Sequence, residues 1–314
     1  MSLTNLIRRL IPGSLKNFIR ARTPLGKVSS LLSPYLPEAL CIDVGASYYP
    51  HIKWLMFLNS PKTYWLAVEP NEKNLSYVQS WKWSSKVFTC TKGLSKEGGQ
   101  QTLYITNLDS GSSLLAPEIP KSMQYRVKDL SYFFPVTERQ IDTLSLMQAI
   151  ENTPKDSPIF IKLDTQGTEL SILQGAGRLF QEHRIVGVEM ESTMLAEPLM
   201  KGSGKFWQAC EFMEQQGFEL LHIKPIHAPK NHRQFIQNKT LTYLNECDAV
   251  FSLRQDIVAS LDPKYHVSLF AFYLTYFFFE EALSLLEQDK QLQGYLIDRG
   301  CKLNVLTHTI RSQV

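Results

Sequence analysis

Short apolar runs alternate with helix-like stretches along the middle of the chain. Seven runs have the length and composition of buried strands: residues 39–44, 63–68, 86–91, 159–163, 184–190, 218–223 and 248–253. Between them, apolar residues recur at helical spacing in four stretches: residues 50–58, 71–83, 169–175 and 206–216. Because strands and helices alternate, the sequence predicts parallel βαβ units with right-handed crossovers, and therefore an α/β fold.

The alternation is interrupted between residues 93 and 150. Residues 96–100 have the composition of a hairpin turn, which predicts that residues 102–106 form a strand leading back. Residues 108–136 have little periodicity, and a loop of that length is usually functional or mobile. Residues 141–150 predict a helix or a step from strand to helix.

The two ends of the chain differ from the middle. Residues 1–37 carry six basic and no acidic side chains, and the first 22 form a basic amphipathic pattern. Such a pattern is typical of contact with an anionic membrane surface, or of a helix that packs on the following domain. Residues 255–314 predict helices rich in aromatic residues and leucine, which we interpret as core, a homodimer face or a groove for a lipid-linked acceptor. We expect an N-terminal arm and linker (1–37), a central α/β domain (38–254) and a helical extension (255–314).

Composition limits the class of protein further. The 314 residues are 44% hydrophobic and 20% charged, as in soluble globular proteins, and a net charge of +3 is too small to indicate nucleic-acid binding. Five scattered cysteines without CxxC spacing indicate a reducing compartment, with neither a disulfide framework nor a zinc site. No apolar run reaches the ~18 residues of a membrane span, and no secretory signal pattern begins the chain. We therefore expect a cytoplasmic protein, with peripheral membrane contact through residues 1–22.

Three carboxylates fall at the predicted carboxyl ends of strands: Asp43, Glu69 and Asp164. Ligands of open parallel sheets bind at this edge. The turn after Asp43 contains Gly45, which lets backbone approach a ligand closely, and a carboxylate such as Glu69 accepts hydrogen bonds from both ribose hydroxyls. The pattern predicts an adenosyl ligand. A dinucleotide or a nucleotide sugar is disfavoured, because neither GxGxxG nor a P-loop is present.

Four segments occur in an order and spacing that resemble one known family: Asp43-Val44-Gly45-Ala46, Glu69-Pro70, Gly111-Ser112-Ser113-Leu114, and residues 162–176, which read KLDTQGTELSILQGA. They resemble FkbM-type methyltransferases. The resemblance implies a Rossmann-like class I fold, with a mostly parallel seven-stranded sheet whose last strand is antiparallel. It also implies S-adenosylmethionine as cofactor and O-methylation of a sugar, glycan or natural-product hydroxyl.

The candidate site residues follow from these motifs. We expect the cofactor to be bound by Asp43, Gly45, Ala46, Ser47, Glu69, Pro70 and Asp164. Asp164 is the first candidate for the catalytic base, or for orienting the cofactor's amino group, and Glu191, placed after the fifth strand, is the second. We expect Ser112 and Ser113 in a lid over the acceptor, or alternatively in a solvated loop.

Other polar residues have simpler interpretations. Glu169 falls in the first turn of a predicted helix, where a carboxylate interacts favourably with the helix dipole, although a role in the site is an alternative. His222, His227 and His232 are spaced by five, which suits no metal pair, so we expect a surface loop and no metal.

The sequence departs from the family pattern directly after Gly45-Ala46. The family has Asn, any residue and Gly there, whereas this chain has Ser47-Tyr48-Tyr49. The missing glycine falls where backbone passes the methionine part of the cofactor. A catalytically silent binding or scaffold protein with the same fold is therefore the alternative to an enzyme.

Overall fold

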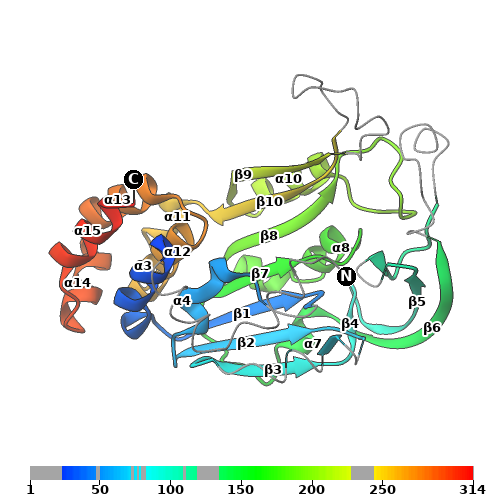
Figure 1. Cartoon of the computed structure of the whole chain (residues 1–314), viewed down its shortest axis with the longest axis horizontal. Helices are drawn as coiled ribbons and strands as arrows, with labels where there is room; N and C mark the ends of the chain where they lie inside the picture. The colour runs from blue at the N-terminus through cyan, green and yellow to red at the C-terminus, as the bar shows by residue number, and fades with distance from the viewer. Residues whose placement is uncertain are drawn as a thin grey trace.

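A seven-stranded sheet forms the centre of the computed structural model, with the order β3-β2-β1-β7-β8-β10-β9 (Figure 1). The structure describes residues 23–46, 50–71, 74–75, 78, 83–108, 111–118, 134–227 and 244–313. The strands are β1 (Ala39–Val44), β2 (Thr63–Val68), β3 (Lys86–Cys90), β7 (Ile159–Leu163), β8 (Ile185–Thr193), β9 (Phe218–His227) and β10 (Leu244–Leu253).

The direction of the strands confirms the predicted class I sheet. Strand β1 pairs in parallel with β2 and β7, and these pair in parallel with β3 and β8. The last strand, β10, is antiparallel to both of its neighbours, β8 and β9. All seven predicted strands are present, but β8, β9 and β10 are longer than predicted. The residues added to β8 are polar, and those added to β9 and β10 mix polar with apolar residues, so continuous hydrophobic runs do not reveal them.

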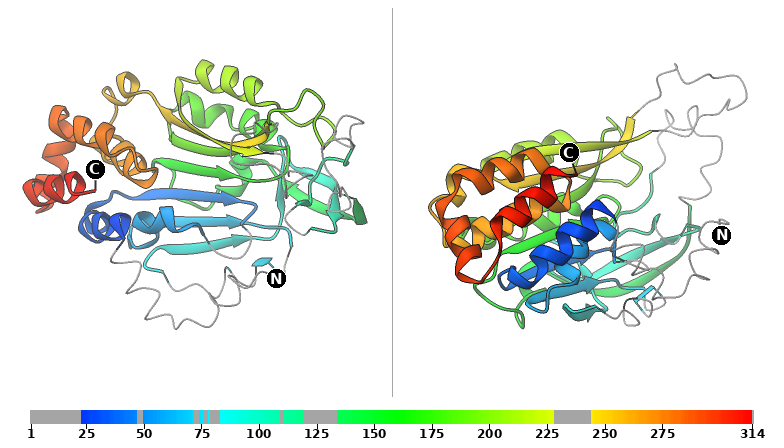
Figure 2. Two further views of the ribbon diagram at one scale, coloured as in Figure 1. Left: turned by 45° about the horizontal axis from the view of Figure 1, so that its top comes forward. Right: turned by 60° about the vertical axis from the view of Figure 1, so that its left-hand side comes forward.

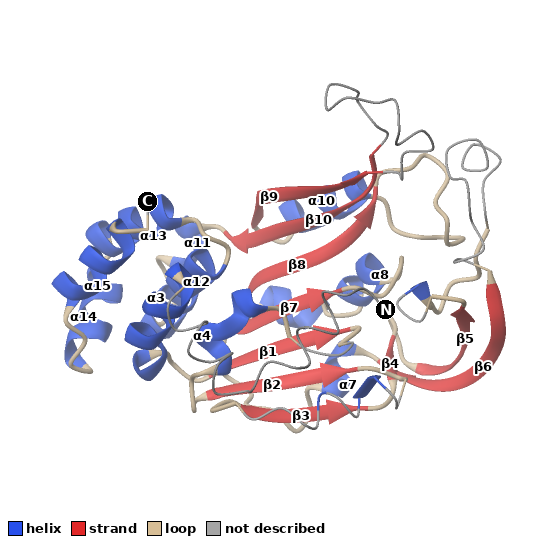
Figure 3. Cartoon of the chain, in the orientation of Figure 1, coloured by secondary structure: helices blue, strands red, loops and turns tan. Residues whose placement is uncertain are grey.

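A second sheet has three strands, β4 (Gly93–Leu94), β5 (Gly99–Thr106) and β6 (Pro135–Leu144), in the order β4-β6-β5 (Figure 3). The prediction of a local hairpin was wrong, because β6 lies between β4 and β5. The Thr143 hydroxyl of β6 donates to the carbonyl of Gly99 and lies 2.8 Å from Ser95 Oγ, which joins both sides of the turn to β6. The predicted step from strand to helix is confirmed by β6 and α7 (Leu146–Ala149), which begins with a capping box.

Helices cover both faces of the central sheet. Short helices on one face include α8 (Glu169–Gln174) and α9 (Gly177–Gln181), followed by α10 (Phe206–Gln215). The other face is covered by α3 (Pro24–Leu32), the short pair η2 (Ile52–Trp54) and α4 (Leu55–Leu58), and the long buried helix α12 (Pro263–Thr275). Most of the helix predicted for 71–83 lies outside the described residues.

The C-terminal helices pack against the sheet and against the first described helix. After α11 (Gln255–Val258) and α12, the chain forms α13 (Phe279–Gln288), α14 (Lys290–Asp298) and α15 (Leu303–Arg311). Helix α15 lies beside α3, which brings the two ends of the described chain together (Figure 2). A Cβ atom at Gly187 of β8 would lie 2.3 Å from the Phe272 ring of α12, so glycine is required for this close approach. None of the described helices combines the length and apolar character that a membrane span requires.

Candidate active site

The three strand-end carboxylates lie at one edge of the central sheet. Asp43 is near the end of β1, Glu69 follows β2 and Asp164 follows β7. Because β1 pairs in parallel with both β2 and β7, the carboxyl ends of the three strands coincide. Glu69 is buried, and its carboxylate accepts a hydrogen bond of 2.8 Å from the backbone N–H of Asn71. The sheet therefore brings together three carboxylates that are far apart in the sequence.

The turn after β1 is hydrogen-bonded to β2 on one side and packs closely on the turn after β7 on the other. The backbone N–H groups of Gly45 and Ala46 donate to the Val68 carbonyl of β2, at 3.0 and 3.1 Å. Gly45 has a φ of +79°, and a Cβ atom on it would lie 2.1 Å from the backbone oxygen of Asp164. Only glycine fits this position, because any side chain would separate β1 from the turn after β7.

A cavity of about 990 Å³, its open mouth included, lies between this edge and the small sheet. From the central sheet and its turns it is lined by Gly45, Glu69, Pro70, Asn71, Asn74, Asp164, Thr165 and Thr168. From β5, β6 and the loop between them it is lined by Leu103, Ile105, Ser112, Ser113, Leu114 and Arg139. The small sheet therefore forms the second wall of the site.

The structure brings most of the predicted site residues to this cavity. Four of the predicted cofactor residues line it: Gly45, Glu69, Pro70 and Asp164. Asp43 and Ala46 are buried behind the wall, and Ser47 lies outside the described residues. Ser112 and Ser113, predicted at the acceptor, line the same cavity as Glu69.

The hydroxyl groups of Ser112 and Ser113 form hydrogen bonds with neighbouring segments of the chain. Ser113 Oγ donates to the Gln166 carbonyl at 2.9 Å, and the backbone N–H of Thr106 donates to Ser112 Oγ at 3.2 Å. These contacts attach the loop to β5 and to the turn after β7.

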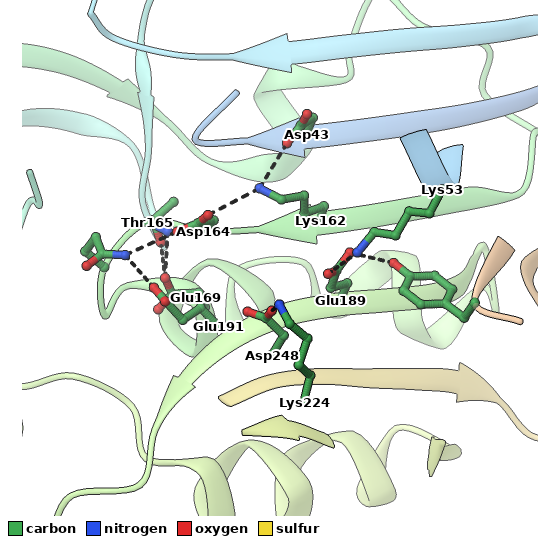
Figure 4. Close-up of polar contacts among 12 residues, drawn as sticks. Asp43, Lys53, Lys162, Asp164, Thr165, Glu169, Glu189, Glu191, Lys224 and Asp248 are labelled. Carbon is green, nitrogen blue, oxygen red and sulfur yellow. Dashed lines mark hydrogen bonds and ion pairs between the residues drawn. The ribbon is translucent and has the colours of Figure 1, made fainter. Parts of the chain in front are cut away.

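Lys162 links two of the strand-end carboxylates (Figure 4). Its ammonium group lies 3.4 Å from Asp43 Oδ1 and 3.5 Å from Asp164 Oδ2. Burial raises the pKa of Asp43, which is 6% exposed, and the neighbouring Lys162 partly offsets this effect. Burial alone would lower the pKa of Lys162, but Asp43, Asp164 and Glu189 together raise it above its ordinary value. Lys162 therefore remains charged and holds Asp164 at the edge of the cavity.

Glu169 holds the turn that follows Asp164. Its carboxylate accepts hydrogen bonds from the Thr165 N–H at 2.6 Å, the Thr165 hydroxyl at 3.0 Å and the Gly167 N–H at 2.9 Å. Burial raises the pKa of Glu169 to about 7, although these hydrogen bonds act in the opposite direction. The observed contacts thus favour the structural interpretation of Glu169, at the first position of α8.

Gln166 connects Asp164 with Glu191. It has a φ of +58°, which is unusual for a residue other than glycine, and its side-chain amide donates to Asp164 Oδ1 at 3.2 Å and to Glu191 Oε2. The sequence predicted that Glu191 follows the fifth strand. Glu191 instead lies within this strand, β8, because β8 continues to Thr193. Burial, followed by the repulsion of Asp164, raises the pKa of Glu191 to about 10. At neutral pH Glu191 is therefore protonated, so it is a poor candidate for a base.

A smaller recess lies on the other side of the turn formed by residues 165–167. It is lined mainly by polar groups: Gln166, Glu169, Glu191, Ser192, Thr193, Ser203 and Glu246. Burial also raises the pKa of Glu246. Asp164 therefore lines the large cavity, and Gln166 connects it with the acid-lined recess.

Asn74 and Arg139 are among the residues of the large cavity that the sequence analysis missed. Asn74 is only 2% exposed, and its Oδ1 atom is buried without a hydrogen-bond partner. The sequence could have indicated Asn74, because it lies in the predicted helix that closely follows Glu69-Pro70. Arg139 had no such signal, because it reaches the cavity only through the pairing of β6 with β5.

The histidines do not share a surface loop. His222 and His227 belong to β9, where His222 is exposed and its ring lies 6.4 Å from that of Phe278. The expected loop is wrong for these two residues, because β9 extends beyond the apolar run. His232 lies outside the described residues.

The strand order, the glycine turn and the strand-end carboxylates around a cavity define a class I, S-adenosylmethionine-dependent methyltransferase fold. The family model of the methyltransferase FkbM domain matches residues 43–220, which is more than half of the chain. The chain therefore belongs to the FkbM methyltransferase family, and it is a methyltransferase of the S-adenosylmethionine-dependent class. No curated protein sequence matches it.

Solved methyltransferase structures resemble the chain only distantly. Precorrin-6y C5,15-methyltransferase from Geobacter metallireducens has 12% identity and a TM-score of 0.33, over 73% of this chain and 88% of that one. An O-methyltransferase from Thermotoga maritima has 8% identity and a TM-score of 0.33, over 81% and 72%. An S-adenosylmethionine-dependent methyltransferase from Mesorhizobium loti has 10% identity and a TM-score of 0.32, over 74% and 99%.

Proposed function

We propose that the chain transfers a methyl group from S-adenosylmethionine to a hydroxyl oxygen of a sugar, glycan or natural-product acceptor. The observation that carries the proposal is the position of Asp164, which lines the large cavity and is joined through Gln166 to the acid-lined recess. The large cavity has the strand-end carboxylates that an adenosyl ligand requires, and the recess is lined mainly by polar and carboxyl groups.

The residues of the large cavity fit the cofactor. The Gly45 turn lets backbone approach a ligand, and Glu69 presents a carboxylate to which ribose hydroxyls donate. Asn74 Oδ1 is a buried acceptor without a partner, and such an atom favours a bound donor. The bound cofactor supplies an electrophilic methyl group. We expect Gly45, Glu69, Pro70 and Asn74 to hold it.

The recess beyond Asp164 suits a hydroxyl-bearing acceptor. Protonated Glu191 donates a hydrogen bond to an acceptor oxygen, whereas the 45% exposed carboxylate of Asp164 accepts one. Glu169, Glu191 and Glu246 line this recess, so it offers several carboxyl groups that can hydrogen-bond an acceptor hydroxyl. Asp164 is therefore the proposed base, and its contacts with Lys162 and Gln166 fix it for proton transfer.

Calorimetric titration with S-adenosylhomocysteine tests the cofactor part of the proposal. We expect saturable binding that Glu69→Ala weakens by roughly tenfold or more, because two hydrogen bonds to a charged group are lost. Glu138→Ala, which removes an exposed carboxylate of β6, is the control and leaves binding unchanged. No binding at millimolar ligand would contradict the proposal and favour the scaffold alternative.

The acceptor part requires a measurement of the product. We expect transfer of labelled methyl groups to hydroxyl-rich glycosides, with an alkali-stable ether as the product, and a loss of about 100-fold or more in Asp164→Asn. Binding of S-adenosylhomocysteine should be nearly unchanged in this variant. Labelled methyl esters or amines would show a different acceptor, and retained activity would remove Asp164 from the mechanism.

We further propose that residues 1–22 contact an anionic membrane surface, on the basis of their basic amphipathic sequence. The full chain should sediment with phosphatidylglycerol vesicles but not with phosphatidylcholine vesicles. Replacing Arg8 and Arg9 by glutamate should abolish sedimentation. Equal sedimentation of this variant and the natural chain would remove the proposed contact and, with it, the argument for a lipid-linked acceptor.

A further inference from the structure

A buried charged contact joins the C-terminal helices to the segment that follows the cofactor turn. Glu189 of β8 is 7% exposed, and each of its oxygens has a partner from a different part of the chain. The Lys53 ammonium group of η2 contacts Oε1, and the Tyr276 hydroxyl at the end of α12 donates to Oε2 at 2.7 Å (Figure 4). Burial and the Glu189 charge raise the pKa of Tyr276 well above its ordinary value. The phenol therefore keeps its proton and acts as a donor.

The Tyr276 ring contacts the same segment directly. The Lys53 ammonium group lies 4.9 Å from the centre of the ring, and the Trp54 ring packs edge-on at a centroid distance of 5.8 Å. Lys53 and Trp54 belong to η2, which begins shortly after the Gly45-Ala46 turn. Tyr276 thus contributes a hydroxyl contact, through Glu189, and a ring contact that a phenylalanine would retain.

The end of α12 is strained at this point. The Phe278 N–H donates to the Tyr273 carbonyl at 2.9 Å and the Phe277 N–H to the Leu274 carbonyl at 3.3 Å, which is the pattern of a Schellman motif. Phe277 has a φ of +65°, where glycine is usual, and its side chain is 53% exposed. The ring therefore gains little burial to offset the strain. Strain of this kind persists where the surrounding structure fixes a conformation, and it often marks functional positions.

We propose that Tyr276 is a positioning residue for the cofactor turn, acting through Glu189 and Lys53. The turn is fixed on one side by β1 and β2. The chain runs from the Gly45-Ala46 turn to Lys53, and Glu189 holds Lys53 in place. The contact between Lys53 and Glu189 therefore limits the positions that the turn can take. The inference rests on the proposed function. It also extends that function beyond residues 43–220, because it assigns cofactor positioning to a helix that the family model does not match.

The test compares two tyrosine hydroxyls of the same helix region. Tyr276→Phe removes the donor to Glu189 but keeps the ring. Tyr273→Phe is the matched control, since Tyr273 is also buried and its hydroxyl accepts a hydrogen bond of 3.2 Å from the Gln255 side chain, away from Glu189. By calorimetry, we expect Tyr276→Phe to weaken S-adenosylhomocysteine binding by roughly five- to tenfold and Tyr273→Phe by less than about twofold.

A second measurement uses the full chain without ligand. Hydrogen exchange in peptides covering residues 50–58 should be faster in Tyr276→Phe than in Tyr273→Phe, at matched thermal stability. Equal binding and equal exchange in the two variants would overturn the inference while leaving the proposed function intact. Absence of S-adenosylhomocysteine binding by the natural chain would instead overturn the proposed function, and this inference with it.

Discussion

Glu189 and Glu191 lie two residues apart on the same face of β8, but their surroundings are opposite in charge. Glu189 contacts Lys53 and the Tyr276 hydroxyl. Glu191 is surrounded by acidic residues, Asp164 and Glu246 among them, and burial with this repulsion raises its pKa to about 10. One buried carboxylate is balanced by a cation, whereas the other is neutralised by a proton.

The difference separates two tasks along one strand. The surroundings of Glu189 come from η2 and from α12, so this glutamate connects the helices to the sheet. The surroundings of Glu191 come from the turn after β7 and from β10, and they leave a protonated acid beside Asp164. A buried ion pair and a protonated acid respond differently to mutation and to pH, and the following predictions use this contrast.

The largest expected effect is that of removing the cation near Glu189. Lys53→Met should lower the free energy of unfolding by about 3 kcal/mol, because it leaves a buried carboxylate without its partner. Urea denaturation measures this loss, and adding Glu189→Gln to the same chain should restore part of it. Lys201→Met removes an exposed cation and should cost less than about 1 kcal/mol. Similar losses in both variants would show that Glu189 does not depend on Lys53.

A smaller effect is expected from the pH dependence of Glu191. Because its folded pKa lies above the ordinary value of 4.5, the folded state holds a proton that the unfolded state loses. Stability should therefore fall as pH rises between about 5 and 10. From about pH 7.5 to 9, above the pKa of Glu169, the unfolding free energy should fall by about 2 kcal/mol more in the natural chain than in Glu191→Gln.

Urea denaturation at the two pH values provides the comparison for Glu191. Glu151→Gln, in which an exposed carboxylate is replaced, should keep the slope of the natural chain. If Glu191→Gln also keeps that slope, Glu191 is not protonated in the folded state, and it would return as a candidate base.

The smallest effect concerns the helix end beside Glu189. Phe277→Gly should raise the free energy of unfolding by about 1 kcal/mol, because glycine adopts a φ of +65° without strain. The conformation of Tyr276 is retained, so binding of S-adenosylhomocysteine should not change. Thermal unfolding and calorimetry check both statements. A destabilised variant would show that the exposed Phe277 ring, which lies 5.8 Å from Phe279, contributes more than the strain costs.

Several elements were predictable because their signals are local. Strands β1, β2 and β7 are short apolar runs bounded by polar or proline residues, and their predicted bounds agree with the structure. The end of β8 after Met190 is polar, and the beginning of β10 before Asp248 mixes polar and apolar residues, so neither forms a continuous apolar run. The turn at Gly98-Gly99 was also recognised, but the strand that follows it pairs with β6, whose paired residues lie 29 to 44 positions further along the chain. Pairing between distant segments depends on packing that no short window of sequence contains.

The sequence by itself determined the class of fold, the strand-end carboxylates and the family, because each depends on residues close together in the chain. Only the tertiary structure decided their chemical environment. Asp164 and Glu191 are both acidic in sequence, but burial among other carboxylates makes Glu191 a proton donor. Tyr276 and Arg139 come from elements far from the motifs: Arg139 reaches the cavity through strand pairing, and packing brings Tyr276 to Glu189 and Lys53. The charge and the role of a side chain depend on burial and on neighbours, which long-range contacts supply.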